Sequence, residues 1–186
     1  NNLSTPNNGL ETIASMSFNW DFGNGQTSTL QDPTATFTNT GVIDSIYIVE
    51  LIAQTQHGCL DTLYDTVTVF PNPRAEFNAT SQVDCAPFVI DSTNITLVPY
   101  PNANDSYTWL VNGVVVGTGT TFPGFTIAVD GDTANIQLVA QNVHACQPDT
   151  FGLQFITIEN PIAGFSAPFY NGCHPLTIPF TDTSTP

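Results

Sequence analysis

A tryptophan on an alternating strand, followed directly by a tight-turn signal, occurs twice in this chain. Apolar and polar residues alternate over residues 16–22 around Trp20, and again over residues 107–111 around Trp109. An Asn-Gly dipeptide follows each stretch. A period of two is typical of a half-buried strand, and Asn-Gly suits the positive φ angles of a hairpin turn. The pattern therefore predicts a β-sheet domain that is repeated along the chain.

Other landmarks recur 87 or 88 residues apart. They are Cys59 with Cys146, Cys85 with Cys173, and the Pro-x-Ala-x-Phe stretch of residues 73–77 with that of residues 161–165. Self-similarity at so long a period indicates tandem domains and not a solenoid of short repeats. We expect a piece of a longer repeated protein, joined at its repeats by short, stiff linkers that contain proline.

The repeat predicts three segments. Residues 1–72 form a domain that lacks its first two strands, residues 73–160 form a complete domain, and residues 161–186 supply the first two strands of a third. Strand patterns fill the complete segment, and no stretch shows a capped 3.6-residue period. About seven short strands in ninety residues, with a core tryptophan on the third, predict an all-β protein of tandem Ig-like antiparallel β-sandwiches. Trp20 and Trp109 are the expected core residues.

The charge balance excludes several partners. The chain has 16 acidic residues, one arginine and no lysine, for a formal net charge of −15. Nucleic acid and anionic membranes are bound through Lys and Arg, so neither is an expected partner. No apolar run reaches the 18 residues of a membrane span, so no direct membrane insertion is expected.

The first tryptophan motif resembles that of a known family. Residues 20–25, Trp-Asp-Phe-Gly-Asn-Gly, resemble the W-D-F-G-D-G motif of PKD (polycystic-kidney-disease-type) domains, and residues 47–51 are similar to their later G-x-Y-x-V-x-L strand. Around Trp109 only the tryptophan and the Asn-Gly turn match, so that segment resembles a diverged PKD-like or Ig-like domain. The pattern of Cys and Pro-x-Ala-x-Phe also resembles tandem repeats of very large Bacteroidota surface proteins, including gliding-motility adhesins and other cargo of the type IX secretion system.

That resemblance implies an extracellular, cell-surface role without catalysis. It implies a repeat segment of a surface filament or adhesin stalk, which transmits force and spaces a tip from the cell. Its partners would be neighbouring repeats of the same protein or filament, with a substratum or polysaccharide at the tip. The sequence leaves two alternatives open. One is a PKD-like module that binds carbohydrate or protein for a secreted enzyme, and the other is a filament subunit that polymerises by strand complementation.

The four cysteines are disulfide candidates, because an acidic chain of strands and repeats suggests an oxidising compartment. Pairing Cys85 with Cys146 is opposed by Ig topology, which places them at opposite ends of a strand of about 23 Å, whereas a disulfide needs Cα atoms within about 7 Å. The alternative joins the Cys85 position of one repeat to the Cys146 position of the next, which would leave the partners of Cys59 and Cys173 outside this chain as well. Pairing within the repeat stays open if the first strand is displaced.

Metal and catalytic sites find little support in the sequence. Asp21, Asp130 and Asp132 are candidates for calcium, but no D-x-D-x-D-G loop contains them, and solvated turn carboxylates are the alternative. Histidines adjoin three of the cysteine positions, yet the C-x-x-C spacing of a zinc site is absent. No Gly-rich phosphate loop precedes a helix. We therefore expect no enzyme, no catalytic residues and no obligatory cofactor.

Two kinds of surface site remain to be considered. Five Asp-Ser or Asp-Thr sequences resemble the D-[S/T]-[A/I/L/V/M/T] O-glycosylation motif of Bacteroidota, and their acceptors would be Ser45, Thr62, Thr66, Ser92 and Thr133. The alternative is that Asp-Thr simply suits strand edges and turns. A carbohydrate platform would need exposed aromatic rings. The tryptophans fall on core positions, which leaves the candidates Tyr47, Tyr64, Tyr100 and Tyr170.

Overall fold

The computed structural model describes residues 13–100 and 103–185, and the chain divides into two compact units. Unit 1 comprises Asn1–Pro73 with Tyr100–Asp105 and Gln141–Pro148, and unit 2 comprises Arg74–Pro99, Ser106–Ala140 and Asp149–Pro186. The described residues form strands and one 3₁₀ turn, η1 (Ile13–Ser15), with no α-helix among them. The prediction of an all-β protein is confirmed. The boundaries predicted at residues 72/73 and 160/161 stay predictions.

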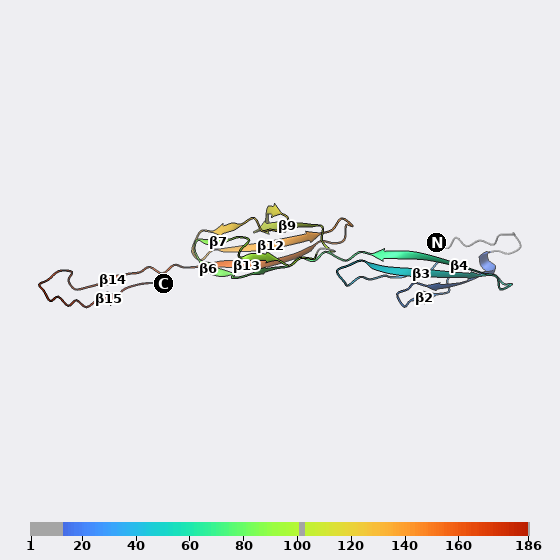
Figure 1. Ribbon diagram of the computed structural model, residues 1–186, viewed down its shortest axis with the longest axis horizontal. Coiled ribbons are helices and arrows are strands. Elements are labelled where there is room, and N and C mark those ends of the chain that lie inside the picture. Colours follow the sequence, from blue (N-terminus) through green and yellow to red (C-terminus); the bar gives the residue numbers. More distant parts are fainter. Residues whose placement is uncertain (1–12, 101–102, 186) are drawn as a thin grey trace. The chain divides into compact units, whose positions relative to one another are not determined.

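Unit 1 contains one antiparallel sheet with the strand order β2-β1-β3-β4 (Figure 1). The bounds are β1 Ser17–Asp21, β2 Thr27–Ser28, β3 Ser45–Gln54 and β4 Leu60–Val69. The two long strands pair over their full ten residues, from Ser45 opposite Val69 to Gln54 opposite Leu60. Their β-branched residues and their period-two alternation favour this extended pairing.

The inner face of the unit 1 sheet is only partly covered. Phe18, Leu51 and Ala53 form its buried cluster, with Ile13, Met16 and Trp20 packed against it. Residues on the other face of β3, such as Ile46 and Ile48, are exposed. Trp20, expected as a core residue, is only half-buried, and its indole N–H donates to the Leu30 carbonyl at 3.1 Å.

Unit 2 has a five-stranded sheet with the order β10-β9-β12-β13-β6 (Figure 1). The bounds are β6 Val83–Cys85, β9 Ser106–Val111, β10 Val114–Thr118, β12 Thr133–Gln141 and β13 Asp149–Ile158. β12 and β13 pair antiparallel, whereas β6 runs parallel to β13. Apolar residues of β12 alternate with polar ones, and the apolar set Ala134, Ile136, Leu138 and Ala140 is fully buried.

Two short strand pairs cover the inner face of this sheet. The bounds are β5 Phe77–Ala79 paired with β8 Ile95–Leu97, and β7 Phe88–Ile90 paired with β11 Phe125–Ile127. A turn at residues 91–94 separates β7 from β8, and Ile95 N–H donates to the Asp91 carbonyl there at 3.0 Å. Together the layers enclose a core of fifteen buried residues with Trp109 at 0% exposure. This is the sandwich that the repeated tryptophan motif predicts.

A last strand pair of unit 2 lies beyond its core. β14 (Phe165–Ser166) pairs antiparallel with β15 (Thr181–Asp182), and a bridge joins Ile162 to Thr185. In both strand pairs the paired residues include a phenylalanine of a Pro-x-Ala-x-Phe stretch, since Phe77 pairs with Leu97 and Phe165 pairs with Asp182.

The hairpin loop that precedes β4 is built in the same way as the loop that precedes β13. The Thr55 hydroxyl accepts the Cys59 N–H at 3.2 Å, and the Asn142 side-chain oxygen accepts the Cys146 N–H at 3.2 Å. One residue before each cysteine the backbone has a positive φ, 84° at Gly58 and 56° at Ala145. Because Cβ disfavours this region, alanine is the costlier residue there.

This loop yields a stability prediction. Replacing Ala145→Gly relieves the left-handed strain, which outweighs the added freedom of the unfolded chain. We expect the free energy of unfolding to rise by about 0.5–1 kcal/mol in urea denaturation followed by circular dichroism. The reverse change in the matching loop, Gly58→Ala, lowers it by a similar amount. A destabilised Ala145→Gly variant would contradict this interpretation of the loop.

Candidate interaction site

Unit 2 shows how the inner face of such a sheet is closed. Phe77 of β5 is 1% exposed, and its ring lies 5.3 Å from that of Trp109 and 5.2 Å from that of Phe151, between ring centroids. Phe88 of β7 lies 6.1 Å from Phe155 in the same way. Aromatic residues of the first two strands therefore pack onto the third and last strands, and this burial supplies much of the core.

The matching positions of unit 1 lack such a cover. Leu63 lies opposite Leu51 in the ladder of β3 and β4, as Phe151 lies opposite Leu138 in the ladder of β12 and β13. Leu63 is 64% exposed, because none of the described residues of unit 1 takes the place of Phe77. Trp20 is half-buried for the same reason, whereas Trp109 is fully enclosed. We call the inner side of β3 and β4 the open face of unit 1.

The open face also has an open edge. β4 is the last strand in its sheet, whereas β13 is flanked by β6, whose Val83 pairs with Ile156. A ten-residue edge strand presents unpaired N–H and C=O groups, and these form a template for another strand. The described residues of unit 1 place no strand beside β4.

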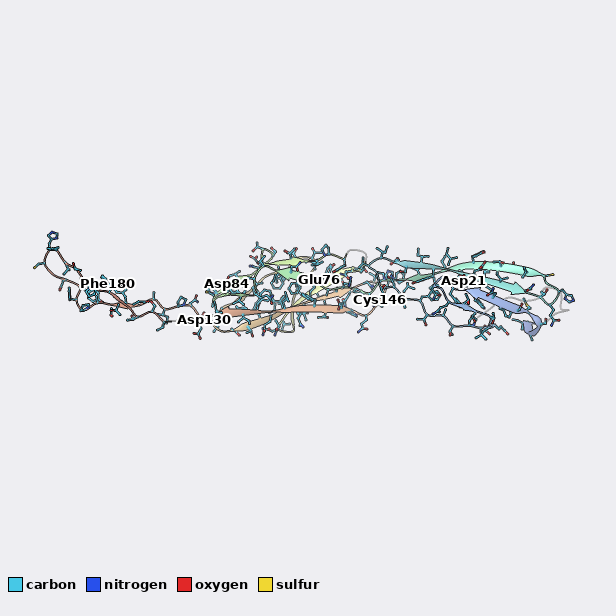
Figure 2. All side chains as sticks on the ribbon, turned by 90° about the horizontal axis from the view of Figure 1, so that it is seen from below. Asp21, Glu76, Asp84, Asp130, Cys146 and Phe180 are labelled. Carbon is cyan, nitrogen blue, oxygen red and sulfur yellow. The ribbon has the colours of Figure 1, made fainter. Side chains whose placement is uncertain are left out.

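The strand pair β14–β15 has the complementary defect. Phe165 is 65% exposed, and Phe180, labelled in Figure 2, is 62% exposed. The two rings contact each other edge-on, with centroids 5.6 Å apart. Leu176, which follows the Cys-x-Pro stretch as Phe88 does in unit 2, is exposed as well. This strand pair carries apolar side chains that have no sheet to cover among the described residues.

A carboxylate sets the position of the first strand in unit 2. Asp149 begins β13 and accepts the Ala75 N–H at 2.8 Å. Asp61 has the matching place in unit 1, since it lies opposite Ala53 as Asp149 lies opposite Ala140. Asp61 is exposed and accepts the N–H of Thr62 at 3.0 Å. The sequence analysis missed this pair of carboxylates, although the repeat spacing aligns them.

The four candidate cysteines are free thiols in the structure, and Cys146 is the only one of them that is partly buried. Cys85 lies beside Ile158, at the end of β13, and Cys146 lies just before Asp149, where β13 begins. The ten residues of β13 extend about 30 Å, so a bond between Cys85 and Cys146 is not compatible with this arrangement. Disulfide formation with other repeats stays a prediction.

The candidate calcium ligands have structural hydrogen bonds. Asp21 accepts the Gly23 N–H at 2.8 Å, and Asp132 accepts the Thr133 N–H at 2.7 Å. Asp130, labelled in Figure 2, accepts the Asn160 side-chain amide at 3.1 Å, at the end of unit 2 where β13 ends. Among the described residues no three His, Cys, Asp or Glu side chains gather as a metal-binding group.

The candidate O-glycosylation acceptors are Thr62, Thr66, Ser92 and Thr133, which are exposed, and Ser45, which is half-buried at the start of β3. In three of the five motifs the aspartate binds the N–H of the residue that follows it, at 2.7–3.0 Å. The motif therefore has a structural use in the backbone, and the acceptor hydroxyls stay candidates.

A hollow of ≈ 680 Å³ opens on the outer face of the unit 2 sheet. Asn135, Gln137 and Gln154 supply its polar lining, and Gly152 leaves room at its floor. Among the tyrosines proposed as a platform, Tyr107's neighbour in the sequence analysis, Tyr64, is exposed and donates to Glu50 at 2.6 Å. This bond to a carboxylate raises the pKa of Tyr64 above its ordinary value.

The comparisons with known proteins agree on a domain class. The PKD domain family matches residues 3–69, the part of the chain that contains Trp20 and the open face. No curated protein matches the sequence. The described part of the chain has no helix long and apolar enough to cross a membrane.

Distant similarities to solved structures fall among sandwich arrays. Fibronectin(III)-like modules of Clostridium thermocellum CbhA match with 18% identity over 77% of this chain and 78% of theirs, at a TM-score of 0.32. The central fibronectin-III array of RIM-binding protein matches with 19% identity over 96% of this chain and 71% of its own, at 0.30. The four N-terminal Ig domains of Dscam1 isoform 1.9 match with 14% identity over 81% and 39%, at 0.30.

One titration follows from the turn that joins β7 to β8. The Thr93 hydroxyl and N–H both donate to the Asp91 carboxylate at 2.7 Å, and these bonds lower the pKa of Asp91 below its ordinary value. Because the folded pKa is depressed, the turn gains stability above the ordinary aspartate pKa and loses it as the pH falls through the lowered value. We expect Thr93→Val to raise the Asp91 pKa in an NMR titration. Thr96→Val, on β8, is the matched control, and an unchanged Asp91 pKa in Thr93→Val would contradict the assignment.

Proposed function

We propose that this chain is a structural repeat segment of an extracellular surface filament or adhesin stalk, without enzymatic activity. The observation that carries the proposal is the path of the chain through unit 2. The chain enters beside Asp149, where Ala75 is bound, and leaves after Ile158, at the other end of β13. Tension applied to the two ends therefore acts along the strands of the sandwich.

This path loads hydrogen bonds in shear. β6 belongs to the entering part of the chain and β13 to the leaving part, and they run parallel with Val83, Asp84 and Cys85 beside residues 156–158. Pulling the ends apart slides β6 along β13, so the bonds between them must break together and not one after another. A sandwich connected in this way suits a segment that transmits force.

The composition supports the same role. A formal net charge of −15 keeps neighbouring stalks apart and soluble, and the repeat of the sandwich extends the reach of whatever it carries. The match of residues 3–69 to the PKD domain supports an extracellular location. The similarity of the cysteine and Pro-x-Ala-x-Phe pattern to gliding-motility adhesins supports that type of stalk, exported by type IX secretion.

Single-molecule pulling between the chain ends tests this role. Asp84→Pro removes an N–H from the β6–β13 ladder, so we expect a clear fall in the force at which unit 2 unfolds. Val116→Pro is the matched control, since Val116 lies in the irregular part of β10, at the far edge of the same sheet. Equal unfolding forces for Asp84→Pro and the unmodified chain would count against a load-bearing role.

A second candidate function rests on the hollow of unit 2. Its amide side chains are suitable partners for the hydroxyl groups of a polysaccharide, as a carbohydrate-binding module requires. The hollow lies on the outer face of the sheet, so it is separate from the apolar core.

A pull-down on insoluble glycans tests this candidate. We expect Gln137→Ala with Gln154→Ala to reduce retention several-fold if the hollow binds sugar, because two amide partners are lost. The matched control is Gln26→Ala, which changes an exposed glutamine of unit 1. Retention that is absent, or that is unchanged in the double variant, would eliminate the candidate.

A further inference from the structure

We propose that the strand pair β14–β15 of one copy docks on the open face of unit 1 of a second copy, and that a disulfide between Cys173 and Cys146 of the two copies locks the dock. The inference rests on the structural role proposed above, and it names the partner through which one segment continues into the next. The argument follows from what residues 73–97 do in unit 2.

Residues 161–182 repeat the part of unit 2 that closes its own sheet. Phe77 pairs with Leu97 in β5–β8, and Phe165 pairs with Asp182 in β14–β15, both antiparallel. A Cys-x-Pro stretch follows the first strand in each case, at Cys85 and at Cys173. The chain therefore holds a second copy of the covering element, and that copy covers no sheet among the described residues.

The apolar surfaces of donor and acceptor match. In unit 2 the ring of Phe77 fills the space between Trp109 and Phe151. The corresponding residues of the dock are Phe165 of the donor, 65% exposed, and Trp20 and Leu63 of the acceptor. Docking buries the donor ring and the acceptor leucine at once, and such burial is the main driving force of association.

Two polar groups fix the register. The Asp149 carboxylate holds the Ala75 N–H in unit 2, and Asp61 with Ala163 are the matching pair in the dock. The Asn160 amide donates to the Ala86 carbonyl at 2.7 Å, and Asn72 with His174 are the matching pair. Asp61 and Asn72 are both exposed in unit 1 and accessible to an incoming strand.

The open edge of β4 completes the dock and places Cys173. β6 runs parallel to β13 with Cys85 beside Ile158. By the same register the donor segment at residues 171–173 lies along β4, with Cys173 beside Phe70 at its end. Edge strands recruit added strands through their unpaired backbone groups, so this pairing adds hydrogen bonds to the apolar contact.

Cys146 is held at that same end of unit 1. The Phe70 ring stacks on the His144 ring with centroids 3.5 Å apart. The Asn142 amide donates to the Pro71 carbonyl at 3.0 Å, and its oxygen accepts the Cys146 N–H. A donor thiol beside Phe70 therefore arrives next to the loop that carries Cys146, as a disulfide requires.

A second copy, and not the same chain, supplies the donor. Ala163 follows Ile158 by five residues, which reach at most about 18 Å. β13 alone separates Ile158 from Pro148, the last residue of unit 1, by about 30 Å. In this head-to-tail dock each copy has one donor and one acceptor, so the contact repeats and forms a chain of copies.

The locking step is a two-electron oxidation. The thiols of Cys173 and Cys146 lose two protons and two electrons and form one S–S bond, and oxidised glutathione, a small-molecule disulfide, takes them up and becomes two thiols. Because each copy carries a formal charge of −15, added salt screens the repulsion between copies and favours the dock.

Thiol trapping tests the proposal. The probe is the full chain with Cys59→Ser and Cys85→Ser, kept in a buffer of oxidised and reduced glutathione with salt. We expect a ladder of disulfide-linked multimers on a non-reducing gel, which dithiothreitol collapses to one band. The matched control carries Cys85→Ser and Cys146→Ser. It leaves Cys59, which lies before the first residue of β4 and so about 30 Å from Phe70. Its cross-linking should be slower by about tenfold or more, because docking does not raise the effective concentration of that pair.

Surface variants in the trapped background identify the two sides. Leu63→Asp disables the acceptor and Phe165→Asp disables the donor, so each variant alone should give no ladder. A mixture of the two should give one disulfide-linked dimer and no longer species. Ile46→Asp, on the outer face of β3, is the matched control and should leave the ladder unchanged, and circular dichroism checks that each variant is folded.

Several results would overturn the inference. They are no multimers in the trapped chain, equal cross-linking in the Cys59 control, or a disulfide formed within one copy. A ladder that survives both Leu63→Asp and Phe165→Asp would overturn it too. These results concern docking alone, whereas the pulling experiment concerns load alone, so the failure of one is distinguishable from the failure of the other.

Discussion

The packing of the first two strands onto the inner face of the main sheet is the contact on which the rest of the structure depends. Phe77 lies between Trp109 and Phe151, and around it a core of fully buried residues forms on β12. Where this contact is made, the sandwich closes. Where it is missing, as on unit 1, a tryptophan in the same sequence setting stays half-buried and the last strand is exposed.

The same constraint explains the exposed apolar side chains at both ends of the chain. Leu63 on unit 1 and Phe165 on β14 are exposed because each represents one half of a contact that unit 2 makes within itself. A chain with an open face and an unused covering strand pair has unsatisfied surfaces that complement each other. Its net negative charge opposes nonspecific association, so register-setting groups such as Asp61 acquire a role in choosing the partner.

Much of this fold was predictable from local pattern. The period of two around Trp20 and Trp109 indicates the strands, and the repeat of 87 or 88 residues aligns Cys59 with Cys146. Burial was less predictable, because it depends on a distant segment: Trp20 and Trp109 have the same local setting and different exposure. The hollow beside Gly152 and the carboxylate of Asp149 on Ala75 arise from contacts between strands, which alternation alone does not reveal.

The most direct test is near-atomic imaging of the native assembly, with the backbone traced across every open sheet of the unit 1 type. The account predicts that a strand pair with the sequence of residues 161–185 lies on each such face, with a phenylalanine ring between Trp20 and Leu63 and sulfur density joining Cys146 to Cys173 of the pair. An inner face left bare, or covered by strands of unrelated sequence, would contradict it.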